Sequence, residues 1–451
     1  MTIYLRETPS AIVDPLSTTL PALPSALPSL EREKGGERPR VVIIGAGFAG
    51  LSAAKALADA PVDVTVIDRR NYHLFQPLLY QVATAALSPA DIATPIRGIL
   101  RSQRNTTVLL ARVTGIDVVA QVVEADGRRI PYDTLIVATG ARHAYFGRDD
   151  WEGVAPGLKK IEDATEIRRR ILIAFERAET SDDPAERRRL LNFVIIGAGA
   201  TGVELAGAIA ELGRKALASD FRKIDPRETR VVLVEAGPRV LPAFPERLSM
   251  KAKRALETLG VEVRLGKPVT GCDDGGITVD GQRIEARTIL WAAGVAASSA
   301  AKWLNAKKDR ADRVIVGSDL TLPGHPEIFV LGDTALAVDA AGKPLPGIAP
   351  VAKQQGFYAA RLIRARTQGK SLPAFRYVHL GNMATIGRKV AVADFGRVAM
   401  SGRIAWLLWG VVHVCFLIGF RNRLAVLLDW LWAYVTFQRG SRLITGPTET
   451  M

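Results

Sequence analysis

Short, uninterrupted apolar runs recur along the chain, and two of them lead directly into glycine-rich turns. Residues 41–44 read Val-Val-Ile-Ile, and residues 193–196 read Phe-Val-Ile-Ile. A continuous apolar run of this length predicts a strand that is buried on both faces, as in a parallel sheet. The alanine-rich segment after the first turn predicts a helix. The pattern therefore predicts a strand–turn–helix unit that occurs twice in an α/β chain.

Both turns have glycine at their first, third and sixth positions. The first glycine permits a tight bend, the second lets the backbone approach a pyrophosphate, and the third lets helix and strand pack closely. The N-terminus of the following helix then attracts the anion. The spacing predicts dinucleotide binding at two sets of glycines: Gly45, Gly47 and Gly50 in the first turn, and Gly197, Gly199 and Gly202 in the second.

Each unit also contains an acidic residue at the end of a second apolar run. Asp68 follows residues 64–67 and Glu235 follows residues 231–234, where a carboxylate can accept hydrogen bonds from ribose hydroxyls. Glu235 lies farther from its turn than is usual, so we expect a longer helix and loop near residues 213–229. The Glu235 carboxylate would repel a 2′-phosphate, which favours NADH over NADPH.

The duplication extends beyond the turns. Thr-Leu-Ile-Val-Ala-Thr-Gly ends at Gly140, 95 residues after Gly45, and Thr-Ile-Leu-Trp-Ala-Ala-Gly ends at Gly294, 97 residues after Gly197. Matching motif and spacing indicate two dinucleotide-binding domains. The alternative is one working site and a decayed structural copy.

The two ends of the chain differ from the middle. Residues 1–38 contain proline every few positions, which prevents a helix, so we expect a mobile extension without a fold of its own. Residues 404–420 have no formal charge, and residues 424–437 have only Asp429. The first of these apolar stretches would span roughly 25 Å, short of the ~30 Å hydrocarbon core.

Aromatic and basic residues accompany this apolar tail, a pattern that favours helices lying in the headgroup region of a membrane. A buried helical hairpin, an oligomer interface and a single transmembrane span remain alternatives. The residues concerned are Trp406, Trp409, Trp430, Trp432, Tyr434, Arg403, Arg421, Arg423, Arg439 and Arg442.

Composition narrows the function classes. Of 451 residues, 48% are hydrophobic and 24% charged, so the chain must bury a sizeable core. The net charge of +14 favours an anionic partner, but no motif or basic helix indicates nucleic-acid binding. The two cysteines, Cys272 and Cys415, exclude a disulfide framework and a multi-cysteine zinc site. The histidines show no ligand spacing, so we expect no metal.

These motifs resemble the two-dinucleotide-binding-domain flavoproteins, and residues 40–445 resemble a type II NADH dehydrogenase, the single-subunit NADH:quinone oxidoreductase of respiratory membranes. The resemblance to this branch rests on residues 71–81, on residues 349–356 and on the aromatic, basic tail. Relatives that reduce disulfides or oxidise sulfide need redox cysteines near the flavin, and this chain has no cysteine before Cys272. Only cysteine can store electrons as a disulfide, so electrons must leave the flavin directly.

The resemblance implies FAD in the first copy and NADH in the second, with hydride passing from NADH to FAD and two electrons then passing to a membrane quinone without proton pumping. The implied FAD-binding residues are Gly45, Ala46, Gly47, Phe48, Ala49, Gly50, Asp68, Arg69, Val113, Thr139, Gly140, Gly332 and Asp333, the last of which would hold the ribityl chain. The implied NADH-binding residues are Gly197, Gly199, Thr201, Gly202, Glu235 and Gly294.

Three residues are implied near the reacting atoms. Glu204 would tune the flavin or relay a proton, although a carboxylate in the first helical turns also interacts with the helix dipole. The family motif usually reads Ala-Gln where this chain has Ala349-Pro350. Either Gln354 or Lys353 takes over the hydrogen bond to the quinone, or apolar walls hold the quinone. His73 is interpreted as a satisfied core or loop histidine.

We therefore expect an α/β fold with two Rossmann-like domains, the FAD domain discontinuous and the NADH domain inserted, plus a helical, membrane-associating C-terminal tail. The resemblance also implies a homodimer joined through the C-terminal region and attachment to an anionic lipid surface on the cytoplasmic face of the inner (plasma) membrane. A same-fold NADH oxidase or ferredoxin-type reductase, and a non-catalytic flavin/NADH redox sensor, remain alternatives. The expected segments are an extension (1–38), the FAD domain (39–150 and 311–372), a helical linker (151–190), the NADH domain (191–310) and the C-terminal region (373–451).

Overall fold

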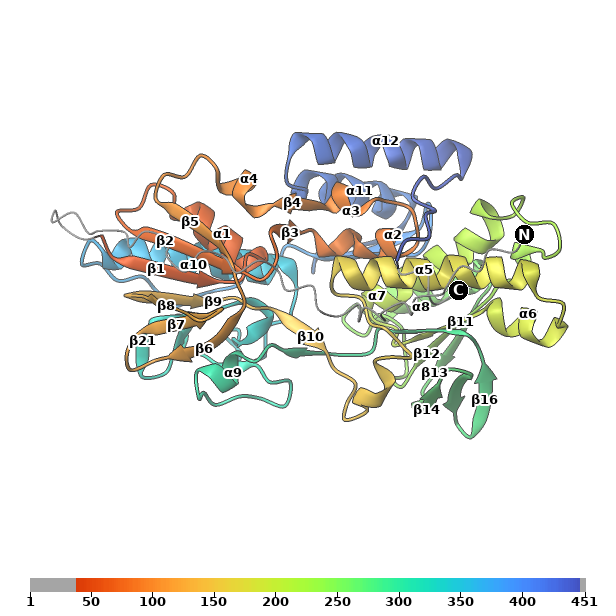
Figure 1. Cartoon of the computed structure of the whole chain (residues 1–451), viewed down its shortest axis with the longest axis horizontal. Coiled ribbons are helices and arrows are strands. Elements are labelled where there is room, and N and C mark those ends of the chain that lie inside the picture. Colours follow the sequence, from red (N-terminus) through yellow and green to blue (C-terminus); the bar gives the residue numbers. More distant parts are fainter. Residues whose placement is uncertain (1–37, 447–451) are drawn as a thin grey trace, which may run out of the picture. The chain divides into compact units, whose positions relative to one another are not determined.

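A six-stranded sheet in the order β20-β21-β9-β1-β2-β5 forms the first half of the fold (Figure 1). The computed structural model describes residues 38–446, so the predicted N-terminal extension, apart from Arg38, lies outside the described residues. In β1, Ile44 pairs in parallel with Ile67 of β2 and Val137 of β9. Helices α1 (Phe48–Ala56) and α10 (Ala349–Arg366) pack against each other. The strands are β1 (Arg40–Ile44), β2 (Asp63–Asp68), β5 (Thr106–Leu110), β9 (Thr134–Val137), β20 (Thr321–Leu322) and β21 (His325–Val330).

Strand β21 completes this sheet after a long excursion of the chain. It pairs in parallel with β9, so that Val330 lies beside Val137. Strand β21, which is followed by Gly332-Asp333, therefore returns to the first half, as the predicted discontinuous domain requires.

A second parallel sheet repeats the arrangement in the order β13-β12-β11-β17. Ile196 of β11 pairs with Val234 of β12 and Trp291 of β17. Each half also has a three-stranded antiparallel sheet, β6-β7-β8 in the first and β14-β15-β16 in the second, which extends the predicted duplication. The elements are β11 (Asn192–Ile196), β12 (Arg230–Glu235), β13 (Val261–Leu265), β17 (Thr288–Trp291), α7 (Ala200–Glu211), α8 (Glu246–Thr258), β6 (Val113–Asp117), β7 (Val122–Ala125), β8 (Arg128–Pro131), β14 (Val269–Asp273), β15 (Gly276–Val279) and β16 (Gln282–Glu285).

Two strands and several helices connect the halves. β10 (Ala141–His143) and β18 (Val295–Ala297) pair antiparallel, and β10 crosses between the two sheets in Figure 1. The predicted helical linker contains α5 (Ile161–Thr180) and α6 (Pro184–Leu190). The remaining short elements are β3 (Tyr72–Leu74), α2 (Leu79–Ala83), α3 (Pro89–Ile92), β4 (Ala93–Pro95), α4 (Ile96–Leu100), α9 (Ala300–Trp303), β19 (Val314–Ile315) and β22 (Ala335–Leu336).

The C-terminal region is not helical throughout. A three-stranded antiparallel sheet of β23 (Asn382–Thr385), β24 (Ala391–Asp394) and β25 (Ala399–Gly402) precedes helices α11 (Arg403–Phe416) and α12 (Phe420–Thr436). The helical tail predicted from the apolar stretches corresponds to α11 and α12. It follows this sheet, in which Gly387 and Gly396, both at positive φ, turn the chain between short strands.

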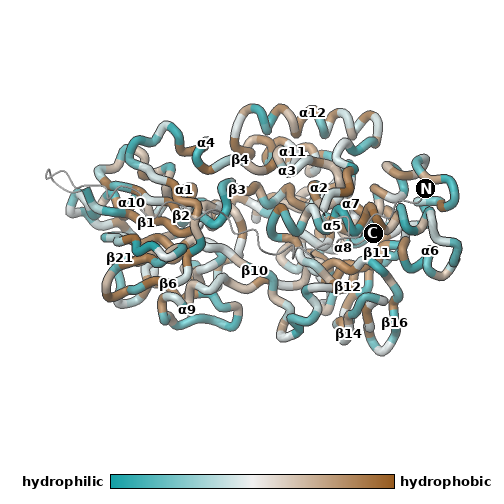
Figure 2. The backbone as a smooth tube through the Cα atoms, viewed as in Figure 1, coloured by the Kyte–Doolittle hydropathy of each residue, from teal (hydrophilic) through white to brown (hydrophobic). Residues whose placement is uncertain are grey.

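Some residues expected at a lipid surface instead make contacts within the protein. Trp409 is buried. Arg439 donates to the carbonyl oxygens of Thr84 and Ala208, at 2.6 and 3.0 Å, and Arg442 pairs with Asp220. Sequence pattern alone did not separate these residues from the exposed ones. Apolar residues recur along α11 and α12 (Figure 2), and no helix within residues 38–446 is long and apolar enough to cross a membrane.

Candidate dinucleotide and electron-transfer site

The first glycine turn leaves room for a ligand at one glycine only. Gly45 has φ +96°, which favours glycine. A Cβ on Gly50 would lie 1.9 Å from the Gly45 carbonyl oxygen, so helix and strand packing requires glycine there. A Cβ on Gly47 would have no atom within 4 Å. Gly47 precedes α1, whose free amide groups attract an anion, and this open position fits the pyrophosphate of FAD.

The second turn repeats this geometry. Gly197 has φ +100°, and a Cβ on it would lie 2.5 Å from the Ala293 Cα. A Cβ on Gly202 would lie 1.8 Å from the Gly197 carbonyl oxygen, whereas one on Gly199 would have no atom within 4 Å. Two turns with the same pair of packed glycines and the same open glycine favour two working sites over one site and a decayed copy.

In each turn, the predicted acidic residue accepts a backbone N–H of the turn and so closes it. In the first copy, Asp68 Oδ2 accepts the backbone N–H of Ala46 at 2.7 Å, and Oδ1 accepts that of Arg70 at 2.8 Å. A carboxylate has about four acceptor positions, so each of these oxygens can still accept a ribose hydroxyl.

The carboxylate of the second copy is held in the same way. Glu235 Oε2 accepts the backbone N–H of Ala198 at 2.7 Å, and Oε1 accepts that of Gly237 at 2.8 Å. Both acids therefore fix the conformation of their turns.

Strand β21 ends at a small cavity that also receives residues from the crossover strands. The cavity has a volume of about 120 Å³, and its lining includes Asp333, Gly332 and residues 295–297 of β18. Asp333 Oδ2 lies 3.6 Å from Lys159 Nζ. The Gly332 N–H donates to Gln355 Oε1 at 2.6 Å. An aspartate between the two halves fits the predicted contact with the ribityl chain.

The hydroxyl groups at the end of β9 join this region. Thr139 Oγ1 lies 2.5 Å from Ser298 Oγ and 3.4 Å from Thr334 Oγ1. The Gly140 carbonyl accepts the Ser298 N–H at 3.1 Å. These contacts fix the end of β9 beside the chain that returns from the second half. In that half, a Cβ on Gly294 would lie 2.5 Å from the ring of Phe146.

Residues around the first turn contact one another and helix α10. His73 Nδ1 donates to the Ala46 carbonyl at 2.8 Å, and burial lowers its pKa, which fits a satisfied, neutral core histidine. The ring of Phe48 lies edge-on to His73, with centroids 5.2 Å apart. Helix α1 approaches α10 so closely that a Cβ on Gly356 would lie 2.2 Å from the Ala49 carbonyl oxygen. Arg69 is exposed.

For two of the residues predicted to bind a cofactor, the structure gives only their place in the fold. Val113 begins β6 and is buried, and Thr201 lies in the first turn of α7.

Glu204 lies on α7, on the side of the helix that meets the C-terminal sheet. Burial raises its pKa to about 8, opposed by a hydrogen bond from the backbone of Thr385 on β23. A carboxyl group with this pKa changes charge near neutral pH, which suits a group that takes up and releases a proton.

Lys353 and Gln354 have separate environments on α10. Lys353 Nζ lies 4.2 Å from the centroid of the Phe416 ring, and burial together with Lys55 lowers its pKa. The Gln354 side chain donates to the Val378 carbonyl at 2.8 Å and accepts the Val378 N–H at 2.9 Å. Gln354 therefore holds the chain near Val378, and its predicted contact with quinone stays a prediction.

The sequence did not indicate a role for Gln355. Its side chain is 1% exposed and accepts the backbone N–H of Gly332, the residue before Asp333. Helical periodicity could have indicated that Gln355 is buried. It shares the buried face of α10 with Val351, Ala352 and Ala359, and a buried amide needs a hydrogen-bond partner.

The two cysteines lie on separate elements. Cys272 lies in strand β14, and burial raises its pKa to about 11. Cys415 is exposed on α11. No group of three or more His, Cys, Asp or Glu side chains that could hold a metal ion occurs between residues 38 and 446.

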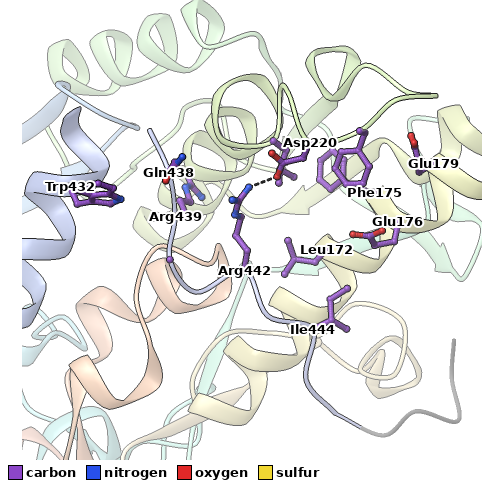
Figure 3. Close-up of a pocket in the computed structure, with 13 residues that line it drawn as sticks. Leu172, Phe175, Glu176, Glu179, Asp220, Trp432, Gln438, Arg439, Arg442 and Ile444 are labelled. Carbon is purple, nitrogen blue, oxygen red and sulfur yellow. Dashed lines mark hydrogen bonds and ion pairs between the residues drawn. The ribbon is translucent and has the colours of Figure 1, made fainter. Parts of the chain in front are cut away.

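A second cavity, of about 600 Å³, lies away from the predicted site residues, between α5, the end of α12 and the C-terminal segment (Figure 3). Arg442 on its wall pairs with Asp220. Glu179 accepts the backbone amides of residues 222–224. None of the residues that line this cavity is among those predicted to bind FAD, NADH or quinone.

Two Rossmann-like halves, each with a carboxylate-closed glycine turn, and an aspartate-bearing strand that returns to the first half define a flavoprotein with two dinucleotide-binding domains. Residues 39–356 match the family model described as pyridine nucleotide-disulphide oxidoreductase, and residues 379–438 match the NDH2 C-terminal domain. The chain belongs to the pyridine nucleotide-disulphide oxidoreductase family and, within it, to the type II NADH:quinone oxidoreductases.

Individual relatives agree with this membership. The type II NADH:quinone oxidoreductase NdhA of Mycobacterium tuberculosis is 49% identical over 438 residues, covering 93% of this chain and 92% of that protein. The type II NADH:quinone oxidoreductase Ndh of the same organism is 48% identical and covers 90% of each chain. The fold resembles that of NDH2 from Plasmodium falciparum, solved in complex with NADH, with a TM-score of 0.82 and 20% identity over 91% of this chain and all of that one.

Proposed function

We propose that this protein oxidises NADH at the turn before α7 and reduces a quinone of the respiratory membrane, with FAD bound at the turn before α1. The observation that carries the proposal is the repeated turn, in which Gly47 and Gly199 are open while Asp68 and Glu235 close the turn from the next strand. The names of both M. tuberculosis relatives support the same activity.

Different residues would bind different parts of the two dinucleotides. Amide groups at the start of α1 and α7 would hold the two pyrophosphates, Asp68 and Glu235 the adenosine riboses, and Asp333 the ribityl chain. When bound, FAD supplies the redox chemistry, accepting hydride from NADH and passing two electrons to quinone. The carboxylate of Glu235 repels a 2′-phosphate, so NADH is the preferred substrate over NADPH.

Glu204 is the proposed proton-handling residue. Quinone reduction consumes protons, and a buried carboxyl group whose pKa is about 8 is protonated at neutral pH and can give up its proton. Lys353, half-buried beside Phe416, is the proposed cationic contact for a quinone that enters between α10 and α11. Cys272 and Cys415 are the only cysteines in the sequence, so the chain cannot relay electrons through a cysteine pair near the flavin.

We further propose that α11 and α12 attach the protein to the cytoplasmic face of an anionic membrane. Both helices expose large apolar side chains, and exposed arginines border them. These residues are Ile404, Leu407, Val411, Leu424, Leu427, Leu428, Leu431, Val435, Arg403, Arg421 and Arg423. Exposed apolar area that is bordered by arginines fits the boundary between headgroups and acyl chains.

A charge placed on this surface tests the attachment. Leu407→Glu with Leu431→Glu should release the protein from vesicles that contain anionic lipid, while flavin content stays unchanged. If the double variant sediments with the vesicles as the wild type does, the surface is not the attachment site. A homodimer joined through the C-terminal region is also proposed, and light scattering on both proteins would show whether the same surface is needed for it.

Anaerobic turnover tests the activity itself. The flavin-loaded protein, NADH and a soluble quinone are mixed without oxygen, and NADH absorbance is followed. We expect NADH loss that matches quinone added, mole for mole. Parallel mixtures contain oxygen or ferredoxin in place of the quinone. NADH loss with oxygen alone would indicate an NADH oxidase, loss with ferredoxin alone a ferredoxin-type reductase, and no sustained loss with any acceptor a redox sensor.

A further inference from the structure

Asp333, the residue assigned to the ribityl chain of FAD, forms an ion pair with a lysine from the linker between the two halves. Lys159 Nζ lies 3.6 Å from Asp333 Oδ2, and the two side chains are 19% and 23% exposed. Asp333 Oδ1 faces Gly347, where an added Cβ would lie 3.1 Å away. Of the ion pairs within residues 38–446, this is the only one that Asp333 makes. The linker therefore supplies the counter-charge of this carboxylate.

Hydrogen bonds fix the backbone of Lys159 just before α5. Asp163 Oδ2, in the first turn of that helix, accepts the backbone N–H of Lys159 at 2.9 Å. His143 Nε2, from the crossover strand β10, lies 3.0 Å from the same oxygen. The Gln76 side chain, from the turn that follows β3, donates to the Lys159 carbonyl at 3.3 Å. Lys159 therefore reaches Asp333 from a backbone that is tied to both the crossover strand and the first half.

The counter-charge of Asp333 becomes more important when FAD is bound. Asp333 and Gly347 line the cavity of about 120 Å³ at the end of β21. A ribityl chain beside Asp333 would remove water from the carboxylate, and a charge that loses its water is costly unless it is paired. Accepting hydride then adds a negative charge to FAD, which an unpaired carboxylate would repel. Lys159 opposes both effects because its ammonium group neutralises Asp333.

We propose that Lys159 is a positioning residue for FAD, which holds the Asp333 carboxylate in place for the ribityl chain and neutralises its charge. The linker between the two halves is thereby part of the flavin site. The inference rests on the proposed function, because it requires FAD at the first turn with Asp333 beside its ribityl chain.

Release of FAD from the flavin-loaded full chain tests the positioning role. The protein is diluted, and the fluorescence of free FAD gives the dissociation constant. Lys159→Met should weaken FAD binding about tenfold, between the effects of breaking an exposed and a buried ion pair. Lys159→Arg keeps the charge and should restore most of the affinity. An FAD dissociation constant that Lys159→Met leaves unchanged would overturn the proposal.

The neighbouring lysine provides a matched control. Lys160 Nζ lies 3.9 Å from Asp163 Oδ1, and its side chain is 40% exposed. Lys160→Met removes the same group one residue along the chain and should leave FAD binding unchanged. If Lys160→Met weakens FAD binding as much as Lys159→Met does, the effect comes from the start of α5 in general and the proposal falls.

A double substitution shows whether Lys159 acts through Asp333. Asp333→Asn removes the charge that Lys159 neutralises, so adding Lys159→Met to Asp333→Asn should weaken FAD binding no further. A full tenfold loss from Lys159→Met in the Asp333→Asn background would overturn the proposal, because Lys159 would then act without its partner.

The midpoint potential of the bound flavin is a second readout, which a purely structural role would not move. It is measured by equilibration with a reference dye of known potential. Lys159→Met leaves the charge of Asp333 unpaired, so the reduced flavin should be disfavoured about tenfold relative to the oxidised flavin, which lowers the potential of this two-electron couple by about 30 mV. Lys160→Met should leave the potential in place. A potential that Lys159→Met does not lower would overturn the neutralising role.

These measurements also separate the inference from the proposed function. If neither Lys159→Met nor Asp333→Asn changes FAD binding while the protein still reduces quinone with NADH, the positioning role falls and the proposed function stands. If both weaken FAD binding and the double variant is no weaker than Asp333→Asn, but quinone does not reoxidise the flavin, the positioning role stands and the proposed quinone reduction falls.

Discussion

Substituting Gly199 by alanine tests the second dinucleotide site while leaving the first untouched. Its φ is −67°, and an added Cβ has no protein atom within 4 Å, so the fold should tolerate the change at a cost below about 1 kcal/mol for the helix cap. The methyl group instead occupies the space that a pyrophosphate needs. Loss of one hydrogen bond to a charged phosphate costs about 1.5–3 kcal/mol, so NADH should bind roughly 10- to 100-fold more weakly.

The assay compares three quantities in Gly199→Ala and wild type: flavin content, melting temperature, and the NADH concentration that gives half-maximal flavin reduction. Only the last should change. Gly202→Ala is the control, because its Cβ would lie 1.8 Å from a backbone oxygen and should lower the melting temperature. Unchanged NADH binding in Gly199→Ala, or loss of flavin in place of NADH, would refute the assignment of the two turns.

Three further substitutions test single residues. Glu235→Gln removes the charge facing the ribose and should narrow the preference for NADH over NADPH by about tenfold, measured as the ratio of kcat/KM values; an unchanged ratio would contradict this role. Glu204 has a pKa raised from 4.5 to about 8, so its contribution to stability is full below pH 4.5 and is lost as pH rises to 8, on the order of 5 kcal/mol. Glu204→Gln should therefore flatten the fall in melting temperature over that range, and a wild-type profile in the variant would contradict the raised pKa. Lys353→Met should slow flavin reoxidation by quinone about tenfold while flavin reduction by NADH keeps its rate, and equal slowing of both steps would remove Lys353 from the quinone site.

The parts of the fold that depend on local sequence could be predicted. Ten consecutive residues are enough to predict a glycine turn after a buried strand. The duplication could be recognised because both copies have nearly the same spacing from this turn to their later Gly140 or Gly294 motif. The return of β21 to the first sheet was expected only through the resemblance to two-dinucleotide-binding-domain flavoproteins, which places an apolar run followed by Gly-Asp in the FAD domain. Short strands such as β23 carry a weaker pattern, so the sheet before α11 was not predicted.

Contacts between distant segments could not be predicted from the sequence. Trp409 and Trp430 look alike in the sequence, but only the folded chain shows that one indole N–H meets Gln81. Likewise, Arg439 resembles an arginine that borders a membrane, yet it lies between α2 and α7. Gln354 and Gln355 are neighbours, and which of them is buried depends on the face that α10 turns toward α1.

The central claim is that electrons pass from NADH through one bound flavin to quinone. Its most direct test is anaerobic sequential-mixing stopped flow, in which NADH is mixed with the flavin-loaded protein and a quinone is added once the flavin absorbance has bleached. The account predicts bleaching by NADH followed by rapid return of the absorbance with quinone. A flavin that NADH does not bleach, or that quinone reoxidises no faster than buffer alone, would contradict it.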